Sequence, residues 1–174
     1  MILGVVLAGG KSSRFGSDKA LAELDGHTLL AHAVDALSGW CEYVVIVGRE
    51  VGPAPTLPDW PKPGMGPLGG LAAGLHLARD EDYEAVMTCG VDSIGLPSDL
   101  DAVLTPANAC LRTQPVIGLW RPDAIAAIER ILTTGEKQSM YHFAEAVGAR
   151  MVDIDGSPAN INTPADLAAA ARQR

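Results

Sequence analysis

The feature that most constrains the fold is an unbroken apolar run at the start of the chain, from Ile2 to Ala8, which ends at Gly9-Gly10. A strand with one face in water alternates apolar and polar residues, whereas a strand buried on both faces reads as a continuous apolar run. A sheet with helices on both sides buries its central strand in this way. The opening segment therefore predicts an α/β fold.

Apolar, β-rich runs alternate with helical patterns along the rest of the chain. The further predicted strands are Tyr43–Val47, Glu84–Cys89, Pro115–Trp120 and Arg150–Ile154. The predicted helices are Thr28–Leu37, Leu68–Ala78, Pro122–Leu132, Glu136–Val147 and a last one capped by Thr163. This alternation predicts a Rossmann-like three-layer αβα sandwich with a mostly parallel central sheet, formed as a single domain by residues 1–174.

Composition narrows the function classes. The 174 residues carry a formal net charge of −8, and an acidic body repels polyanions, so we expect no general nucleic-acid binding. No apolar run approaches the roughly 18 residues of a membrane helix, and no basic segment precedes the first strand as in a signal peptide. Three scattered cysteines, Cys41, Cys89 and Cys110, indicate buried thiols in a reducing compartment. We therefore expect a cytoplasmic protein that does not act at a membrane.

The glycines after the first strand lie where parallel α/β sheets bind ligands, beyond the carboxyl ends of their strands. Gly9 and Gly10 accept positive φ, and successive N–H groups in such a turn can form an anion-binding nest. Lys11, Arg14 and Lys19 then place three cations close together in sequence. We interpret the segment as a triphosphate cradle, with Arg14 as a planar fork and Lys19 as a point charge. The alternative is an exposed basic loop after a strand.

The segment from Leu7 to Lys19, Leu-Ala-Gly-Gly-Lys-Ser-Ser-Arg-Phe-Gly-Ser-Asp-Lys, resembles the signature of the molybdenum cofactor guanylyltransferases. These belong to the nucleotidyltransferases with a nucleotide-diphospho-sugar transferase fold. The resemblance implies that the first four residues lie at the nucleotide, and that Arg14 and Lys19 contact its phosphates. Related cytidylyltransferases tend to have Ala-Ala-Gly where this chain has Ala8-Gly9-Gly10, which favours guanine over cytosine.

A second glycine-rich segment, Gly66-Pro67-Leu68-Gly69-Gly70-Leu71, opens a predicted helix and resembles the family's Gly-Pro-Leu-x-Gly segment. A helix N-terminus can face an anion or a nucleobase, so we expect Gly66 at the nucleotide. In the family an acidic residue just upstream contacts the guanine. Asp59 is the only acid between Gly52 and Gly66, and a carboxylate can accept from both the ring N–H and the exocyclic amine. The alternative for Asp59 is an acid in a surface loop.

Asp92 follows the strand predicted to end at Cys89, so its carboxylate is expected to face the glycine-rich loop. Mg²⁺ is usually bound by one or two carboxylates together with substrate phosphates. The family pattern is roughly Cys-Asp-x-Pro-x-Leu-Pro, and the resemblance implies that Asp92 is the metal-binding acid. This chain departs from the pattern, because Val91 precedes the acid and Ser93-Ile94 replace x-Pro. The alternative is a loop acid or a helix cap.

The C-terminal segment Asn160-Ile161-Asn162-Thr163-Pro164-Ala165-Asp166-Leu167 reproduces the family's Asn-x-Asn-Thr-Pro-x-Asp/Glu-Leu motif. Asn160 and Asn162 alternate around Ile161, so they point the same way on an extended segment. We expect Asn162 at the metal or triphosphate and Asn160 at the second substrate. By itself, the segment reads as a capped helix with polar loop residues. Lys137 is a further candidate phosphate contact, or an ordinary cation at a helix start.

The resemblance implies transfer of GMP from GTP to the phosphate of the molybdopterin cofactor, with release of pyrophosphate. Arg14, Lys19 and Asp92 are the expected catalytic residues, with Mg²⁺ as cofactor and proteins of cofactor biosynthesis or cofactor acceptors as possible partners. Two alternatives within the enzymes are a cytidylyltransferase for the same pterin and a sugar-phosphate nucleotidyltransferase. An alternative from another class is a non-catalytic, regulatory nucleotide-binding protein.

Overall fold

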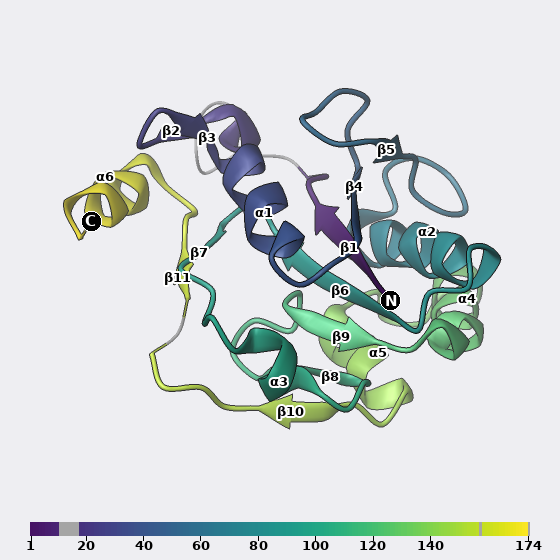
Figure 1. Cartoon of the computed structure of the whole chain (residues 1–174). Coiled ribbons are helices and arrows are strands. Elements are labelled where there is room, and N and C mark those ends of the chain that lie inside the picture. Colours follow the sequence, from purple (N-terminus) through teal and green to yellow (C-terminus); the bar gives the residue numbers. More distant parts are fainter. Residues whose placement is uncertain (11–17, 157, 174) are drawn as a thin grey trace.

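A seven-stranded sheet with the order β10-β8-β9-β6-β1-β4-β5 forms the centre of the protein (Figure 1). The computed structural model describes residues 1–10, 18–156 and 158–173. The strands of this sheet are β1 (Ile2–Leu7), β4 (Tyr43–Val47), β5 (Thr56–Leu57), β6 (Ala85–Gly90), β8 (Ala109–Leu111), β9 (Gly118–Trp120) and β10 (Arg150–Val152). β1 runs parallel to β4 and β6, while β9 runs antiparallel to both of its neighbours. The predicted mostly parallel sheet is confirmed.

The apolar run in β1 is buried on both faces, as its sequence predicts. Leu3, Val5 and Leu7 join one hydrophobic cluster, and Val6 and Ala8 join another on the opposite side. The first cluster is covered by α2 (Gly66–Asp80), α4 (Ile125–Thr133) and α5 (Met140–Ala146), and the second by α1 (Leu29–Ser38) and α3 (Leu100–Leu104). Helices on both faces of the sheet give the predicted three layers. Of the helices described, none is long and apolar enough to cross a membrane.

Several element boundaries differ from the prediction, and for two of them the local contacts show why. The strand predicted over Pro115–Trp120 is shorter, because the chain turns first, with the Ile117 N–H donating to the Gln114 carbonyl at 2.9 Å. The helix predicted over Glu136–Val147 begins only at Met140. Ser139 is its N-cap, with an extended backbone and a side chain that accepts a hydrogen bond from the His142 N–H. A capping serine fixes the first turn more strongly than the apolar periodicity around it.

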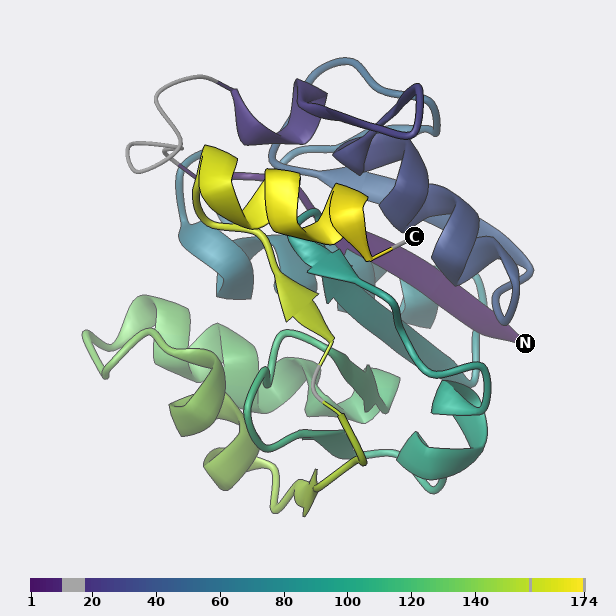
Figure 2. The same cartoon turned by 90° about the vertical axis from the view of Figure 1, so that its left-hand side faces the viewer.

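Several short elements have too little sequence pattern to predict. They are η1 (Lys19–Leu21), η2 (Pro122–Ala124), the hairpin of β2 (Glu23–Leu24) and β3 (His27–Thr28), and the ladder of β7 (Ser93–Ile94) and β11 (Ala159–Asn160). The predicted last helix is α6 (Pro164–Arg172), with a capping box between Thr163 and Asp166. α6 packs beside β2, β7 and the start of α1 through a small cluster that includes Leu24, Ile94 and Ile161 (Figure 2).

Candidate active site

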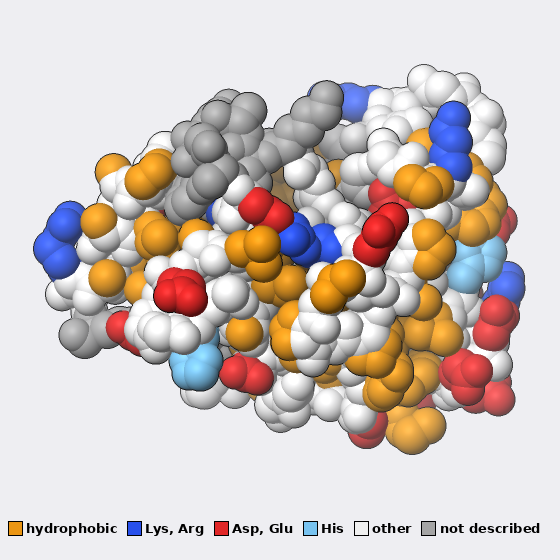
Figure 3. Space-filling view, turned by 90° about the horizontal axis from the view of Figure 1, so that it is seen from above, with side chains coloured by type: hydrophobic (Ala, Val, Ile, Leu, Met, Phe, Trp, Pro, Cys, Tyr) orange, Lys and Arg blue, Asp and Glu red, His pale blue; other side chains and the backbone are white. Residues whose placement is uncertain are grey.

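Adjoining cavities open where β1, β4 and β6 end, and all of them are lined by Gly9. Their volumes are about 250, 510 and 90 Å³. The largest part lies toward the β4–β5 loop and the smallest toward η1. Seen from above, this surface is hollowed, with basic and acidic side chains close together (Figure 3). The predicted residues that line the first cavity are Leu7, Gly9, Lys19, Asp59, Gly66 and Asp92. Gly10 lines the second cavity, and Ala8 lines the third.

The floor between the ends of β1 and β4 is bare main chain. Ala8 N–H donates to the Val47 carbonyl at 2.9 Å, which continues the pairing of the two strands into their loops. Gly48 has φ of 88°, and a Cβ placed there would lie 2.5 Å from the Cα of Gly9. Gly10 has φ of 123°, and a Cβ placed there would meet nothing within 4 Å among the described residues. The glycines therefore allow two loops to touch and leave their backbone open to a ligand.

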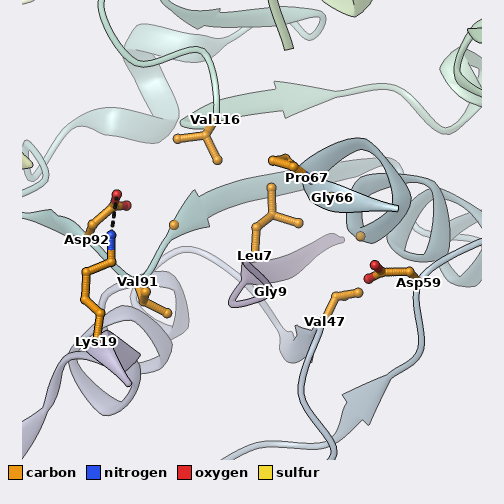
Figure 4. Close-up of a pocket in the computed structure, with 12 residues that line it drawn as sticks. Leu7, Gly9, Lys19, Val47, Asp59, Gly66, Pro67, Val91, Asp92 and Val116 are labelled. Atoms are coloured by element: carbon orange, nitrogen blue, oxygen red, sulfur yellow. Dashed lines mark hydrogen bonds and ion pairs between the residues drawn. The ribbon is translucent and has the colours of Figure 1, made fainter. Parts of the chain in front are cut away.

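At one end of the first cavity, Lys19 and Asp92 form an ion pair, with 3.3 Å between Nζ and Oδ2 (Figure 4). Their side chains are 17% and 24% exposed, so the pair is largely withdrawn from water while still facing the cavity. Lys19 comes from η1 and Asp92 from the loop after β6. We call this pair the charged end of the cavity.

Gly90, the last residue of β6, makes room for the Asp92 carboxylate, because a Cβ at Gly90 would lie 2.6 Å from Asp92 Oδ1. No cluster of three or more His, Cys, Asp or Glu side chains suited to a metal occurs among the described residues. A single carboxylate still fits Mg²⁺, which commonly takes one or two carboxylates and completes its shell with water and substrate phosphates. The donor chemistry of Asp92 thus matches a metal shared with a bound triphosphate.

On the opposite side of the same cavity, Asp59 lies beside the start of α2 (Figure 4). Its Oδ2 accepts a hydrogen bond of 3.1 Å from the Met65 N–H. The neighbouring Trp60 N–H donates to the Gly69 carbonyl at 3.0 Å. Gly66 has φ of 71°, so the chain turns sharply into the helix there. We call Asp59 and Gly66 the helix end of the cavity, where the carboxylate is held by main chain.

An ion pair that the sequence analysis missed connects Asp18 with Arg49. The guanidinium donates through two nitrogens to the two carboxylate oxygens, at 2.9 and 2.7 Å. Asp18 lines the third cavity, and Arg49 lines the second. Arg49 follows Gly48 directly, so a basic residue just after a predicted strand end was the available signal.

Ser93 and Ile94, the two residues after Asp92 that depart from the family pattern, form β7. Ser93 pairs with Asn160 and Ile94 with Ala159 in the antiparallel ladder with β11, and the Ile161 N–H donates to the Asp92 carbonyl at 2.9 Å. This ladder brings the asparagine motif beside the Asp92 loop. Neither Asn160 nor Asn162 is among the residues that line the cavities. Their predicted contacts remain predictions.

Val116 also lines the first cavity. Its carbonyl accepts a hydrogen bond of 2.7 Å from the buried Thr88 hydroxyl, which in turn accepts one of 3.0 Å from Trp120 Nε1. Nearby, Gln114 Nε2 donates to the Pro158 carbonyl at 2.7 Å. The loop before β9 is thus fixed both to the sheet and to the segment that leads into β11.

Two predicted cations do not contribute to the described site. Arg14 lies outside the described residues. Lys137 is exposed in the turn before α5 and does not line the cavities. Within the part of the chain that the structure describes, the cations at the cavities are Lys19 and Arg49, and each of them faces a carboxylate.

The thiols are unsuited to nucleophilic chemistry. Cys89 and Cys110 are buried, as predicted, whereas Cys41 is half-buried. Burial raises the pKa of Cys41 to about 12 and that of Cys110 to about 11, and it also raises the pKa of Cys89. A thiol kept protonated is a poor nucleophile. The site therefore offers main-chain donors and ion-paired side chains instead of a covalent catalyst.

Comparison with known proteins places these features in context. Residues 4–150 match the family model of the MobA-like NTP transferase domain. A molybdenum cofactor guanylyltransferase of Rhodobacter capsulatus is 36% identical, over 97% of this chain and 94% of that protein. Another, of Acidiphilium cryptum, is 37% identical over 95% and 92%. The crystal structure of molybdopterin-guanine dinucleotide biosynthesis protein A from Archaeoglobus fulgidus has a TM-score of 0.73 at 19% identity, covering 98% and 97% of the two chains. This last likeness is one of fold.

Proposed function

The chain belongs to the MobA-like NTP transferase family, and from this premise we propose that it transfers GMP from GTP to the phosphate of the molybdopterin cofactor. Two relatives that match over nearly the whole chain are named molybdenum cofactor guanylyltransferases. The observation that carries the proposal is the single cavity in which Gly9, Lys19, Asp59 and Asp92 meet. They come from three separate segments of the chain, with Gly9 and Lys19 in the first and Asp59 and Asp92 in the other two.

The reaction needs no nucleophile from the protein. A phosphate oxygen of the pterin attacks the α-phosphorus of GTP, a new P–O bond forms, and the bond between the α-phosphorus and the bridging oxygen to the β-phosphate breaks. Pyrophosphate leaves with the electron pair of that bond. A phosphate monoester has its second pKa near 6 and is largely dianionic at neutral pH, so the attacking oxygen requires no general base. The protein's task is to position two anions and to offset their charge.

Each end of the cavity has its own task in this scheme. At the charged end, Lys19 binds the triphosphate and offsets the charge that develops on pyrophosphate, together with Arg14. The main-chain N–H groups around Ala8, Gly9 and Gly10 bind phosphate oxygens beside Leu7. At the helix end, Gly66 lets the nucleotide approach the backbone. Asp59, already oriented by the Met65 N–H, accepts hydrogen bonds from guanine.

Asp92 is the proposed ligand of Mg²⁺, which when bound supplies positive charge to the phosphates. In the structure Asp92 is oriented by its contact with Lys19 and by the space above Gly90. Asn160 and Asn162 are proposed to contact the second substrate and the triphosphate, since β11 holds their segment beside β7. We also propose a single domain of residues 1–174, a cytoplasmic location, and proteins of cofactor biosynthesis or cofactor acceptors as partners.

The test is release of pyrophosphate from GTP in the presence of molybdopterin and Mg²⁺, for the wild type and for Asp92→Ala. Removing one preorganised electrostatic group from an active site costs on the order of 10²- to 10³-fold in kcat. Arg121→Gln is a matched control, because Arg121 forms an exposed pair with Asp123 and lies outside the cavities that adjoin Gly9. Equal rates for the wild type and Asp92→Ala would remove Asp92 from the mechanism. Absence of turnover in the wild type would favour a nucleotide-binding protein without catalytic activity.

A further inference from the structure

We propose that Arg49 and Asp18 form a clasp that positions Lys19 and masks the Asp18 carboxylate, so that the cavity accepts a triphosphate. The clasp rests on the proposed function, since it concerns the same cavity. Arg49 is here a positioning residue with no required contact to the substrate. The inference comes from the contacts of these two side chains and from where they lie in the fold.

The clasp joins the loop after β4 to the start of η1. Arg49 extends from the loop after β4, and its guanidinium is forked on Asp18 at 2.9 and 2.7 Å. Asp18 directly precedes Lys19, which reaches the loop after β6 through Asp92 at 3.3 Å. Two consecutive residues of the chain are therefore tied to opposite neighbours of β1. A bidentate Arg–carboxylate pair fixes orientation as well as distance, so the backbone that carries Lys19 is fixed from one side by Arg49.

Asp18 also shapes the segment that carries Lys19. It is the N-cap of η1, and its Oδ1 accepts a hydrogen bond of 3.2 Å from the Ala20 N–H. Arg49 holds the same oxygen. A cap oxygen that is itself held by a rigid fork has little freedom to rotate away. Arg49, which follows β4, thus fixes the position of the turn Lys19–Leu21 through Asp18.

The clasp also corrects an electrostatic conflict. A phosphate cradle is a poor place for a carboxylate, yet Asp18 lines the third cavity together with Gly9, Gly10 and Lys19. Like charges repel at these distances. The Arg49 guanidinium offsets the negative charge, and its hydrogen bond is the main reason why the pKa of Asp18 lies below its ordinary value. Asp18 therefore stays ionised and paired, and Lys19 stays directed to Asp92 and the cavity.

The burial of Arg49 separates this pair from the surface ion pairs of the protein. The side chains of Arg49 and Asp18 are 20% and 44% exposed, whereas those of Arg121 and Asp123 are 60% and 65% exposed. Arg49 Nε is buried and finds no hydrogen-bond partner among the described residues. An ordinary exposed pair contributes little. A half-buried guanidinium whose Nε is withdrawn from water in order to hold one carboxylate indicates a structural demand at that place.

The test uses the whole chain and compares Arg49→Met, Asp18→Asn/Arg49→Met and Arg121→Met. Direct titration calorimetry with GTP and with inorganic tripolyphosphate gives dissociation constants, and pyrophosphate release gives KM and kcat. In Arg49→Met the Asp18 carboxylate loses the guanidinium that offsets its charge. GTP binding should weaken and KM should rise by about tenfold, while kcat stays within about threefold of the wild-type value. In the double variant the amide oxygen that replaces the carboxylate still caps Ala20 but carries no charge. Binding should then recover to about threefold weaker than in the wild type, because the unmasked charge is gone while Lys19 still lacks the fork that positions it. Arg121→Met should bind GTP like the wild type.

Two results would overturn the clasp. One is Arg49→Met with unchanged binding and KM. The other is a double variant that binds no better than Arg49→Met, which would mean that the Asp18 charge is not what Arg49 offsets. If Arg49→Met has a lowered Tm, Arg49→Lys replaces it: this variant keeps the charge and loses the fork, and it must give an intermediate KM. Calorimetry keeps the test separate from the proposed reaction, because a wild type that binds GTP without turnover would refute the reaction and still test the clasp.

Discussion

The two ends of the cavity hold their carboxylates in different ways. At the charged end, Asp92 is paired with the cation Lys19. At the helix end, Asp59 is held by the Met65 N–H, a neutral donor. A carboxylate opposite a cation responds strongly to any further charge that enters the site, whereas one held by a neutral group keeps its oxygens oriented for hydrogen bonds. The charged end therefore suits phosphates and metal, and the helix end suits recognition of a base.

The division of labour also follows from what each end is made of. The charged end consists of two ionised side chains that reach the cavity from different elements, Lys19 from η1 and Asp92 from the loop after β6. The helix end is built from a turn in which Gly66 has a positive φ and Gly69 packs closely against Met65 and Asp59. Ionised side chains interact with the charge that develops on the phosphates during the reaction, whereas a rigid turn distinguishes bases by their shape and hydrogen-bonding groups. Changes at the charged end should affect all nucleoside triphosphates alike, and changes at the helix end should affect their ranking.

The largest effect is expected at the close contact between Gly48 and Gly9, which forms the floor of the cavity. Gly48→Ala would place a Cβ 2.5 Å from the Gly9 main chain at φ of 88°. The left-handed backbone alone costs roughly 1–2 kcal/mol, and the clash adds to this, so Tm should fall by about 5 °C or more. Binding of GTP and of tripolyphosphate should be lost together. Gly39→Ala is the control, since its φ is −71° and its Cβ would lie 3.4 Å from the Ala36 carbonyl oxygen. Thermal melts that are equal for the two variants would contradict the close contact.

Lys19→Ala should give the next largest loss. Removing the cation eliminates charge compensation for the triphosphate and takes away the ion pair of Asp92, so kcat/KM should fall about 100-fold. Because the change is at the charged end, GTP and CTP should weaken by the same factor in calorimetry. A changed ratio between the two nucleotides would break the proposed separation of the ends.

Gly69→Ala should perturb the helix end more gently. A Cβ there would lie 2.4 Å from Met65 Cβ and 3.2 Å from Asp59 Cβ, so the turn that orients Asp59 must shift. We expect KM for GTP to rise about fivefold, with little change in the binding of tripolyphosphate, since a shift of one oriented hydrogen-bonding group costs about 1 kcal/mol. If tripolyphosphate binding weakens equally, the helix end does not act on the base.

The smallest effect is expected at a carboxylate far from both ends. Hydrogen bonds from His142, Thr134 and Arg130 lower the pKa of Glu136 from 4.5 to about 2. A carboxyl with a lowered pKa in the folded state stabilises the protein above its ordinary pKa, and this stabilisation is lost as the pH falls toward 2. Glu136→Gln should lower Tm at pH 7 by about 2 °C. The difference from wild type should shrink between pH 4.5 and 2, while GTP binding stays unchanged. A difference independent of pH would refute the ionic origin.

The local sequence pattern was sufficient to predict the central strands of the sheet and most of the residues that line the cavity. The apolar run of β1 predicts its burial, and parallel strands bring their carboxyl ends to one edge, so residues after Ala8, Val47 and Cys89 had to meet there. The resemblance of the flanking motifs supplied their roles. The family and the fold were both confirmed by the comparisons.

Features that depend on long-range pairing could not be predicted. Arg49 and Asp18 are 31 residues apart, and neither belongs to a pattern that names the other. The ladder of β7 and β11 pairs two residues from each strand across a long stretch of chain, too few for a periodic signal. The direction of β9 is also set by packing. Such contacts depend on the assembled fold.

The proposed function depends above all on the selection of guanine by Asp59 at the helix end. Its most direct measurement is calorimetric binding of GTP and CTP to the wild type and to Asp59→Asn. The wild type should bind GTP more tightly than CTP. In Asp59→Asn, GTP binding should weaken by about tenfold or more, because a hydrogen bond to a charged group is lost, and CTP binding should be unchanged. Tighter binding of CTP than GTP by the wild type, or equal weakening of both nucleotides in the variant, would contradict it.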